Sequence, residues 1–181
     1  MDIEKLPIGE NPPKDVNLVV EVAMRSDPVK YELDKVSRAL VVDRFLQTAM
    51  SYPGNYGFIP HTLSDDGDPV DVLAVGKLPV IPGAVMRVRP IGVLLMEDEA
   101  GQDEKVLAVP HPKLKPFYDD VTNYDQLHHS VLDEIEHFFS QYKALEPGKW
   151  VKVKGWADVK EAEKVITDAI ARAGNAPGAA A

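Results

Sequence analysis

Three aspartates stand close together in the segment Asp66-Gly67-Asp68-Pro69-Val70-Asp71-Val72, at the entrance to an apolar run. Gly67 and Pro69 disfavour a straight strand, so we expect a curled loop that can aim all three carboxylates inward. Clustered carboxylates repel one another unless a cation or a proton lies between them, and such oxygen ligands suit a hard divalent metal ion. A solvated acidic turn is the alternative, but a third aspartate leading straight into a buried strand favours a metal site.

An EF-hand calcium loop is the obvious rival for this segment, and two positions exclude it. A loop beginning at Asp66 would need Gly at its sixth position, where Asp71 stands, and a bidentate Glu at its twelfth, where Lys77 stands.

A second acidic segment runs from Glu97 to Glu104 and ends at Lys105. It joins two predicted strands, so on its own it indicates a hydrophilic hairpin loop. Asp98 and Asp103 contribute to chemistry only if the fold brings them close to the first cluster, which the mouth of a barrel would permit.

Charged residues also interrupt the first predicted strands. Glu21 stands in an otherwise apolar run. Lys30 and Glu32 are two positions apart, hence on one face of a strand, and both can point into a single cavity. A solvent-facing sheet surface explains them equally well. Arg44 follows a short apolar strand and, taken alone, indicates a surface charge.

An aromatic segment, Tyr52-Pro53-Gly54-Asn55-Tyr56-Gly57-Phe58, contains a Pro-Gly pair that suits a tight turn with Gly54 at positive φ. Such a turn would bring Tyr52 and Tyr56 together. Their hydroxyls could donate to an anion, but aromatic packing under a loop is favoured without other observations.

Tyr142 and Lys143 come at the end of a predicted helix. Tyr142 belongs to the apolar stripe of that helix and is expected in the core, and a lysine at this point suits the helix dipole. No metal-ligand spacing connects the five histidines, which we interpret as structural or interfacial: His61, His111, His128, His129 and His137. Cysteine is absent, so any metal must be held by oxygen or imidazole.

Many short strands followed by two helices position these residues. Pro and Gly divide the first part of the chain into short apolar segments, which is typical of strands. The predicted strands cover residues 18–24, 29–33, 39–42, 70–75, 84–96, 105–109 and 150–156. This order predicts a mainly β (α+β) fold, a small closed or nearly closed barrel with the helices packed outside.

The two helices are expected over residues 123–145 and 158–173. The first carries a stripe at helical spacing and ends at Pro147-Gly148; the stripe is Leu127, Val131, Ile135, Phe138 and Tyr142. For the second, Asp158 is the expected cap, with Glu161 as a capping-box carboxylate, and Gly174 is the expected stop. The tail after Gly174 is expected to fray, residues 176–181 above all.

Length and charge limit the class of protein. The chain has 181 residues, which predicts a single domain over residues 1–181, and a formal charge of −9. Negative charge argues against a nucleic-acid partner but permits small phosphates if cations mediate. The beginning of the chain does not resemble a signal peptide, and no apolar run approaches the roughly 20 residues of a membrane span. A cytoplasmic enzyme or binding protein, with no membrane partner, is therefore expected.

Taken together, these segments resemble the family I soluble inorganic pyrophosphatases in their short bacterial form. The signature from Asp66 to Val72 matches that family at every position, and the similarity extends from about residue 10 to residue 170. Gln141 stands where some bacterial members carry a histidine near the subunit interface. Further matches occur in the family's order: Glu21, Lys30-Tyr31-Glu32, Arg44, Tyr52 to Gly57, Asp98, Asp103-Glu104-Lys105 and Tyr142-Lys143.

The resemblance implies a five-stranded OB-like barrel, a homohexamer and Mg²⁺-dependent hydrolysis of pyrophosphate to two phosphates. Several Mg²⁺ ions would bind in each site, with Mn²⁺, Zn²⁺ or Co²⁺ as substitutes. Asp68 would be the general base, while Glu21 would support the site through water and Tyr52 would lie behind it. The implied metal ligands are Asp66, Asp71, Asp98, Asp103 and, through water, Glu32. The implied phosphate-binding residues are Lys30, Arg44, Tyr56, Lys105, Tyr142 and Lys143.

Three other functions compete with this interpretation. A nucleic-acid-binding OB-like module would share the barrel, and its tyrosines could stack on bases, but it predicts a basic groove. A divalent-ion-binding structural protein explains the carboxylates and leaves Lys30, Arg44 and Lys105 unexplained. A phosphohydrolase acting on nucleotides or phosphate esters differs from a pyrophosphatase only in its substrate.

Overall fold

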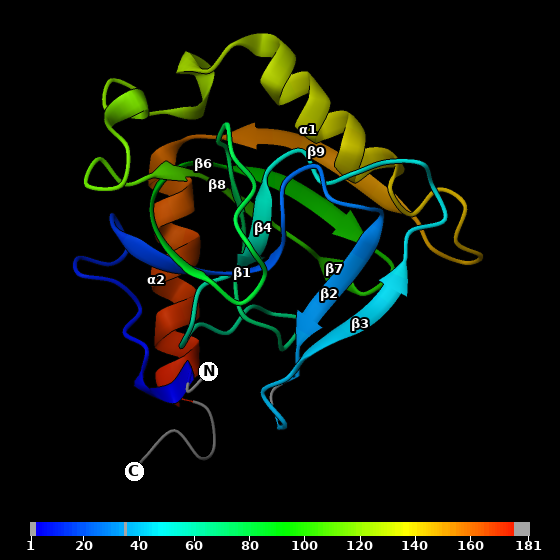
Figure 1. The fold of residues 1–181 in the computed structure, drawn as a ribbon, viewed down its shortest axis with the longest axis horizontal. Coiled ribbons are helices and arrows are strands. Elements are labelled where there is room, and N and C mark those ends of the chain that lie inside the picture. Colours follow the sequence, from blue (N-terminus) through cyan, green and yellow to red (C-terminus); the bar gives the residue numbers. More distant parts are fainter. Residues whose placement is uncertain (1–2, 35, 176–181) are drawn as a thin grey trace.

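The computed structural model describes residues 3–34 and 36–175 (Figure 1). A 3₁₀ turn at Ile3–Lys5 precedes the first strand. The strands are β1 Val16–Val22, β2 Val29–Leu33, β3 Leu40–Phe45, β4 Asn55–Phe58, β5 Asp71–Ala74, β6 Val85–Asp98, β7 Gly101–Gln102, β8 Lys105–Pro110 and β9 Val151–Ala157. The α-helices are α1 His129–Gln141 and α2 Val159–Asn175, and 3₁₀ turns lie at Pro116–Tyr118 and Tyr124–Gln126.

Within the described residues, five strands close into a ring. β1 pairs with β4, β4 with β5, β5 with β8, β8 with β6, and β6 returns to β1. Only β5 and β8 in this ring run parallel to each other. β9 and β7 add to β6 outside the ring, and β2 and β3 form a separate hairpin. The predicted five-stranded, mainly β ring with two helices outside it is therefore confirmed (Figure 1).

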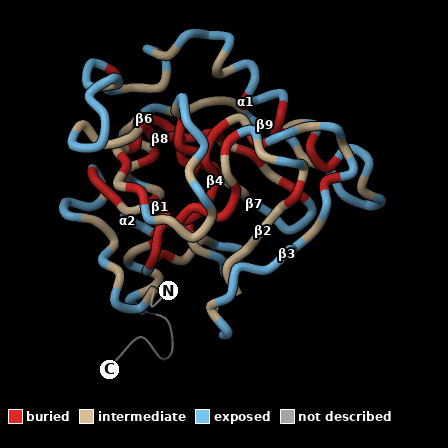
Figure 2. Tube along the Cα trace, viewed as in Figure 1, coloured by how far each residue is buried: buried red, intermediate tan, exposed pale blue. Residues whose placement is uncertain are grey.

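The period-two alternation of the ring strands separates two packed clusters, one for each helix. Val72 of β5 and Val106 of β8 pack in the cluster that contains Ile166 of α2. Leu73 and Leu107, one position on, pack in the cluster that contains Phe138 and the other aromatic residues of α1. Successive strand residues point to opposite faces. Asp71 and Lys105, two residues before Leu73 and Leu107, therefore face the α1 side. The buried segments in Figure 2 follow these ring strands.

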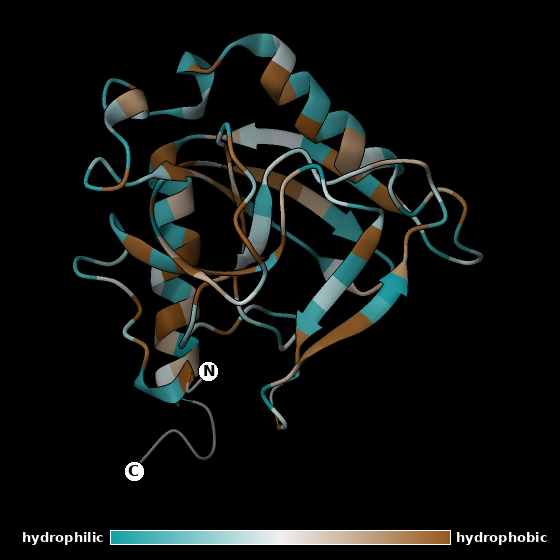
Figure 3. Ribbon diagram, viewed as in Figure 1, coloured by the Kyte–Doolittle hydropathy of each residue, from teal (hydrophilic) through white to brown (hydrophobic). Residues whose placement is uncertain are grey.

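The hairpin of β2 and β3 is exposed along β3. Leu40, Val41, Val42 and Phe45 are apolar and exposed, and Figures 2 and 3 show the same strand as exposed and largely hydrophobic. An apolar strand open to solvent is a feature of surfaces that bind another chain.

Both helices were predicted, and the Asp158 cap of α2 is confirmed, but the predicted beginning of α1 and the predicted ends of both helices are wrong: α1 ends at Gln141 rather than near residue 145, and α2 continues through Gly174 to Asn175. Helix α1 starts at His129 rather than near Asn123, because Asn123 and Gln126 form a capping box on a short 3₁₀ turn and Leu127 is extended. Helix α2 starts at Val159, and Asp158 caps it by accepting a hydrogen bond from the Glu161 amide at 3.1 Å. The predicted tail over residues 176–181 lies outside the described residues.

Strand β4 is not among the predicted strands, and the tight turn expected before it is wrong. Gly54 does not have a positive φ; instead a Cβ there would lie 2.7 Å from the carbonyl oxygen of Ala74. At Gly57 the contact is closer still, with Val19 O at 1.9 Å from the position of a Cβ. Both glycines are therefore required by the close approach of β4 to its neighbours. In the described part of the chain, no helix is long and apolar enough to cross a membrane.

Candidate active site

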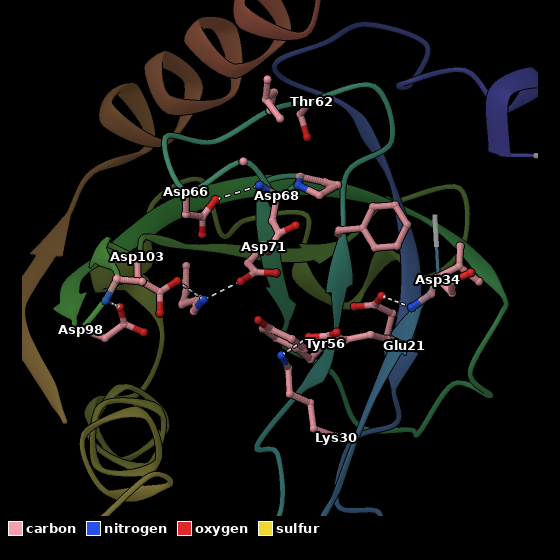
Figure 4. A pocket seen from close by; sticks show the side chains of 18 of the residues that line it. Glu21, Lys30, Asp34, Tyr56, Thr62, Asp66, Asp68, Asp71, Asp98 and Asp103 are labelled. Carbon is pink, nitrogen blue, oxygen red and sulfur yellow. Dashed lines mark hydrogen bonds and ion pairs between the residues drawn. The ribbon is translucent and has the colours of Figure 1, made fainter. Parts of the chain in front are cut away.

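A cavity of about 590 Å³ opens where the ring strands meet the β2–β3 hairpin and the end of α1 (Figure 4). The residues singled out from the sequence line it together, although they come from segments far apart in the chain. They are Glu21, Lys30, Glu32, Arg44, Tyr56, Asp66, Asp68, Asp71, Asp98, Asp103, Lys105, Tyr142 and Lys143. Tyr52 is not among the lining residues.

The loop from Asp66 to Asp71 turns its three aspartates into this cavity (Figure 4). The Gly67 amide donates to Ser64 O at 3.1 Å, and Gly67 has a φ of 89°. The Asp68 amide donates to the Asp66 carboxylate at 2.9 Å, which fixes the Asp66 side chain. The curled loop expected from Gly67 and Pro69 is thus the conformation observed.

Lys105 connects the two acidic segments. It is 4% exposed, and its Nζ lies 2.5 Å from Oδ2 of Asp71 and also contacts the Asp103 carboxylate. Burial alone would lower the pKa of Lys105, but the charges of Asp71 and Asp103 outweigh it and raise that pKa well above its ordinary value. The ammonium group therefore stays charged and neutralises this part of the cavity.

Lys143 holds the other aspartate of the second segment. Its Nζ lies 2.6 Å from Oδ2 of Asp98, whose Oδ1 accepts the Ala100 amide at 2.8 Å. Burial acts to raise the pKa of Asp98, but the hydrogen bonds from Lys143 and Ala100 outweigh it and lower the pKa below its ordinary value. Asp98 is consequently an ionised carboxylate on the cavity wall.

The β2–β3 hairpin contributes a second group of charges. Lys30 contacts Glu32, its neighbour on the same strand face, and lies 3.4 Å from Asp43. Arg44 lies 2.7 Å from Asp43 and donates from Nε to Glu146 at 3.1 Å. These contacts hold both basic groups on the wall of the cavity.

Glu21 is a carboxyl group of the site whose pKa is strongly raised. It is buried, and its Oε1 accepts the Leu33 amide at 2.8 Å. Burial, with the nearby charges of Asp71 and Glu32, raises the pKa of Glu21 to about 8, against the opposing effects of the Leu33 amide and Lys30. Glu21 thus retains a proton near neutral pH when no further cation is close.

Tyrosine side chains form the apolar floor of the cavity. The rings of Tyr52 and Tyr56 are 4.9 Å apart, so the predicted approach of the two residues is observed, and Tyr52 also packs on Phe138 at 4.7 Å. Burial raises the pKa of the Tyr56 and Tyr142 hydroxyls, so both remain protonated donors. Tyr52 is 1% exposed and supports Tyr56 from behind.

The donor set fits a divalent cation by its chemistry. In the described part of the chain, no three carboxylate or imidazole groups converge closely enough to surround an ion as they stand. Burial raises the pKa of Asp66, and the negative charges of Asp68, Asp71 and Asp103 raise it further, against the Asp68 amide. The cavity therefore holds more negative charge than its lysines neutralise, and its carboxylate oxygens suit Mg²⁺ or a similar ion.

Several ion-pair partners of the site residues were not predicted from the sequence. Glu146 is separated from Arg44 by 102 positions, and Asp43 is the neighbour of Arg44 in β3. Glu99 and Lys149 pair at 2.5 Å beside Lys143. Glu99 belongs to the acidic segment from Glu97 to Glu104, but its pairing with Lys149, like the pairing of Glu146 with Arg44, can be recognised only once the fold is known.

A closed ring of strands whose cavity combines carboxylates with lysine, arginine and tyrosine donors indicates a class of protein, the enzymes that act on phosphate compounds. The sequence model of a family described as inorganic pyrophosphatase matches residues 18–174. The chain belongs to this inorganic pyrophosphatase family, and so to the inorganic diphosphatases.

Individual relatives agree over nearly the whole chain. An inorganic pyrophosphatase of Rhodospirillum rubrum is 63% identical over 171 residues, which are 94% of this chain and 96% of the relative. One of Agrobacterium fabrum is 60% identical over 172 residues, 95% of this chain and 97% of the relative.

Solved structures show the same fold. The chain is similar to an inorganic phosphatase of Anaplasma phagocytophilum, with a TM-score of 0.90 and 55% identity over 92% of this chain and 99% of the other. An inorganic pyrophosphatase of Thermus thermophilus has a TM-score of 0.90 at 44% identity, covering 96% of this chain and 99% of the other.

Proposed function

We propose that this chain hydrolyses inorganic pyrophosphate to two orthophosphates in a reaction that requires Mg²⁺. The observation that carries the proposal is the composition of one cavity. Carboxylates suited to divalent cations and donors suited to phosphate oxygens line the same space. A structural ion-binding protein needs only the first set, and a nucleic-acid module needs only the second.

Charge explains why cations are required. A cavity rich in carboxylates repels pyrophosphate, and bound cations reverse the local sign. Asp66, Asp71, Asp98 and Asp103 would hold Mg²⁺, with Glu32 contributing through water. When bound, Mg²⁺ neutralises phosphate charge and makes a coordinated water more acidic.

The residues of the chain then position the substrate and move one proton. The oxygen of water bonds to one phosphorus, the bond from that phosphorus to the bridging oxygen breaks, and the bridging oxygen leaves with the second phosphate. Asp68 accepts the proton of the attacking water at its carboxylate. Charge on the leaving phosphate is stabilised by Lys30, Arg44, Tyr56, Lys105, Tyr142 and Lys143.

In this scheme, Lys105 and Lys143 each bind aspartate carboxylates first and phosphate oxygens later. Each now contacts aspartates, and a cation that binds those aspartates leaves the ammonium groups to donate to phosphate oxygens. The same contacts that neutralise the cavity thus keep the donors in place for the substrate.

Phosphate release from pyrophosphate, with Mg²⁺ and then with excess chelator, tests the activity. We expect rapid release that needs Mg²⁺ and little release from ATP under the same conditions. Release from ATP at a similar rate would favour the nucleotide phosphohydrolase, and oligonucleotide binding without turnover would favour the nucleic-acid module. A folded protein that releases no phosphate with any divalent metal contradicts the proposal.

Asp68→Asn tests the general base. We expect kcat to fall by roughly 10²–10⁴, the range for a general acid or base. Asp65→Asn is the matched control, because Asp65 belongs to the same loop but pairs with Arg172 at 3.1 Å outside the cavity. An Asp68→Asn variant with the turnover of the control removes Asp68 from this role.

We also propose that the chain forms homohexamers and acts in the cytoplasm. The family resemblance supports the hexamer, as do exposed apolar side chains such as Phe45, Leu78 and Ile81, which are 71%, 68% and 75% exposed in the single chain. Light scattering during size-exclusion chromatography measures the mass, and a monomeric mass at micromolar concentration contradicts the hexamer.

A further inference from the structure

The cavity continues past the proposed pyrophosphate site into an N-terminal lobe, lined by Ile3, Glu4, Arg38, His61 and Leu63. None of these residues has a role in the proposed reaction. The whole cavity, at about 590 Å³, lies in the range that accommodates drug-sized ligands. A small inorganic anion leaves part of this space to other groups.

The side chains of Arg38 and His61 contact the N-terminal segment beside this lobe. Arg38, at the tip of the β2–β3 hairpin, contacts Glu4 with 2.5 Å between Nη2 and Oε1. His61, from the segment after β4, contacts the carbonyl oxygen of Leu6 through Nε2 at 2.9 Å. Segments from three parts of the chain therefore meet at the lobe, and Arg38 brings a guanidinium group to its wall.

The backbone at both residues is unusual. Arg38 has a φ of 58° and His61 a φ of 57°, in the left-handed region that favours glycine. Among the residues that the structure describes, Arg25 is the one other non-glycine residue with positive φ. Strained backbone of this kind is concentrated at ligand-binding sites, where the side chain is needed in a particular place. At Arg38 the side chain so placed is a cation facing the cavity.

Glu4 is a weak competitor for that cation. Its side chain is 78% exposed, against 30% for Arg38, and exposed ion pairs contribute little stability. A phosphate group offers a guanidinium more negative charge than a carboxylate does, and like a carboxylate it can accept a bidentate contact. Phosphate in the lobe should therefore displace Glu4.

We propose that Arg38 is a further anion-binding residue of this cavity, and that Glu4 and a phosphate group compete for its guanidinium. Orthophosphate leaving the site and pyrophosphate entering it share the chemistry that Arg38 recognises. The proposal rests on the proposed function, since it extends the same phosphate site toward the N-terminal turn.

Calorimetric titration of orthophosphate into the protein with Mg²⁺ tests this proposal without requiring turnover. We expect Arg38→Gly to weaken orthophosphate binding about tenfold, as for a lost hydrogen bond to a charged group. Arg38→Lys, which keeps the charge, should recover part of that loss. Glu4→Gln should tighten binding about two- to fivefold, because it removes one carboxylate that competes for Arg38.

Arg25→Gly is the matched control. It relieves the same kind of backbone strain as Arg38→Gly, and Arg25 lies outside the cavity and 3.9 Å from Glu134, with its side chain 71% exposed. Both glycine variants should melt no lower than the parent, whereas only Arg38→Gly should change the affinity for orthophosphate. The KM for pyrophosphate, measured on the same variants, shows whether the substrate also uses Arg38.

The double variant Glu4→Gln, Arg38→Gly distinguishes direct anion binding by Arg38 from a general effect of charge in the cavity. Glu4→Gln should have no effect on orthophosphate binding in the Arg38→Gly background, because its effect passes through Arg38. Equal affinities in Arg38→Gly and Arg25→Gly would overturn the proposal, and so would a Glu4→Gln effect that persists without Arg38. A parent protein that binds orthophosphate but releases none from pyrophosphate would refute the proposed function, whereas the comparison of orthophosphate affinities among the variants would still decide whether Arg38 binds the anion.

Discussion

Replacing Lys105 with methionine should destabilise the protein unless a divalent cation is present. Lys105 is the shared partner of Asp71 and Asp103, with side-chain exposures of 5%, 28% and 12% respectively. Methionine keeps the unbranched apolar part of the side chain and removes its charge, so two partly buried carboxylates lose their counter-ion. Removing one member of a buried ion pair costs about 3–5 kcal/mol.

The lower end of that range applies here, because Asp71 retains some contact with water. A loss of about 3 kcal/mol lowers the melting temperature by about 6–12 °C in a chain of this size. Mg²⁺ binds the same carboxylates in the proposed site and takes over the role of the ammonium group. More than half of the lost stability should therefore return when Mg²⁺ replaces the chelator.

Urea unfolding with chelator and with Mg²⁺ measures both effects, and Lys152→Met is the control. Lys152 is 69% exposed and lies 3.5 Å from Glu97, so its replacement should cost less than about 1 kcal/mol in either buffer. A Lys105→Met protein as stable as the control in chelator would refute the argument from burial. A loss of stability that Mg²⁺ leaves unchanged would refute the shared site of cation and lysine.

Three further predictions concern the metal, the pH dependence and the ring. Asp103→Ala should weaken Mg²⁺ activation of phosphate release, and an unchanged metal titration would contradict its role as a ligand. The folded-state pKa of Glu21 is raised to about 8 from an ordinary 4.5. Between these two pH values the folded protein holds the proton of Glu21 more tightly than the unfolded chain does, so the free energy of unfolding falls as the pH rises. The fall is at most about 1.4 kcal/mol per pH unit. Unfolding in chelator should therefore depend less on pH in Glu21→Gln, and parallel pH profiles would argue against the raised pKa. Gly57→Ala should prevent folding or lower the free energy of unfolding by more than about 3 kcal/mol, because its Cβ would lie 1.9 Å from Val19 O. Circular dichroism and thermal melting measure this effect. A stable variant would show that β1 and β4 can separate.

Much of the fold was predictable because the ring strands carry simple patterns. Val72 and Leu73, like Val106 and Leu107, divide between two hydrophobic clusters. Their apolar character identifies strands even before the partners are known. Strand β4 lacked such a pattern, since its four residues Asn-Tyr-Gly-Phe include a glycine required by a contact with β1. A requirement that comes from a distant strand cannot be detected in the local sequence.

The beginning of α1 shows a second limit of local patterns. Leu127 has the spacing of the helical stripe but an extended backbone, because the Asn123–Gln126 capping box forms a separate turn first. Hydrophobic periodicity records which side chains face the core, and a short turn followed by a helix can satisfy it as well as one longer helix.

The family resemblance implied that the predicted charged residues share one site, whereas their pairing could not be predicted. From the residues alone, Asp98 and Asp103 were expected near the first aspartate cluster only if the fold brought them there. The partners Glu146 of Arg44 and Glu4 of Arg38 lie 102 and 34 positions away from them. Ion pairs between residues so far apart in the chain form only when the ring has closed and the β2–β3 hairpin has packed beside it.

The parallel pairing of β5 with β8 makes assembly of the cavity inseparable from closure of the ring. Asp71 and Lys105 are 34 positions apart in the chain and become neighbours through this one pairing. Contacts between distant segments form late in folding, since the entropy of closing a long loop must be overcome first. In a nascent or partly unfolded chain the carboxylates of the two acidic segments are therefore scattered, and the completed ring brings Asp71 and Asp103 to one lysine in one cavity.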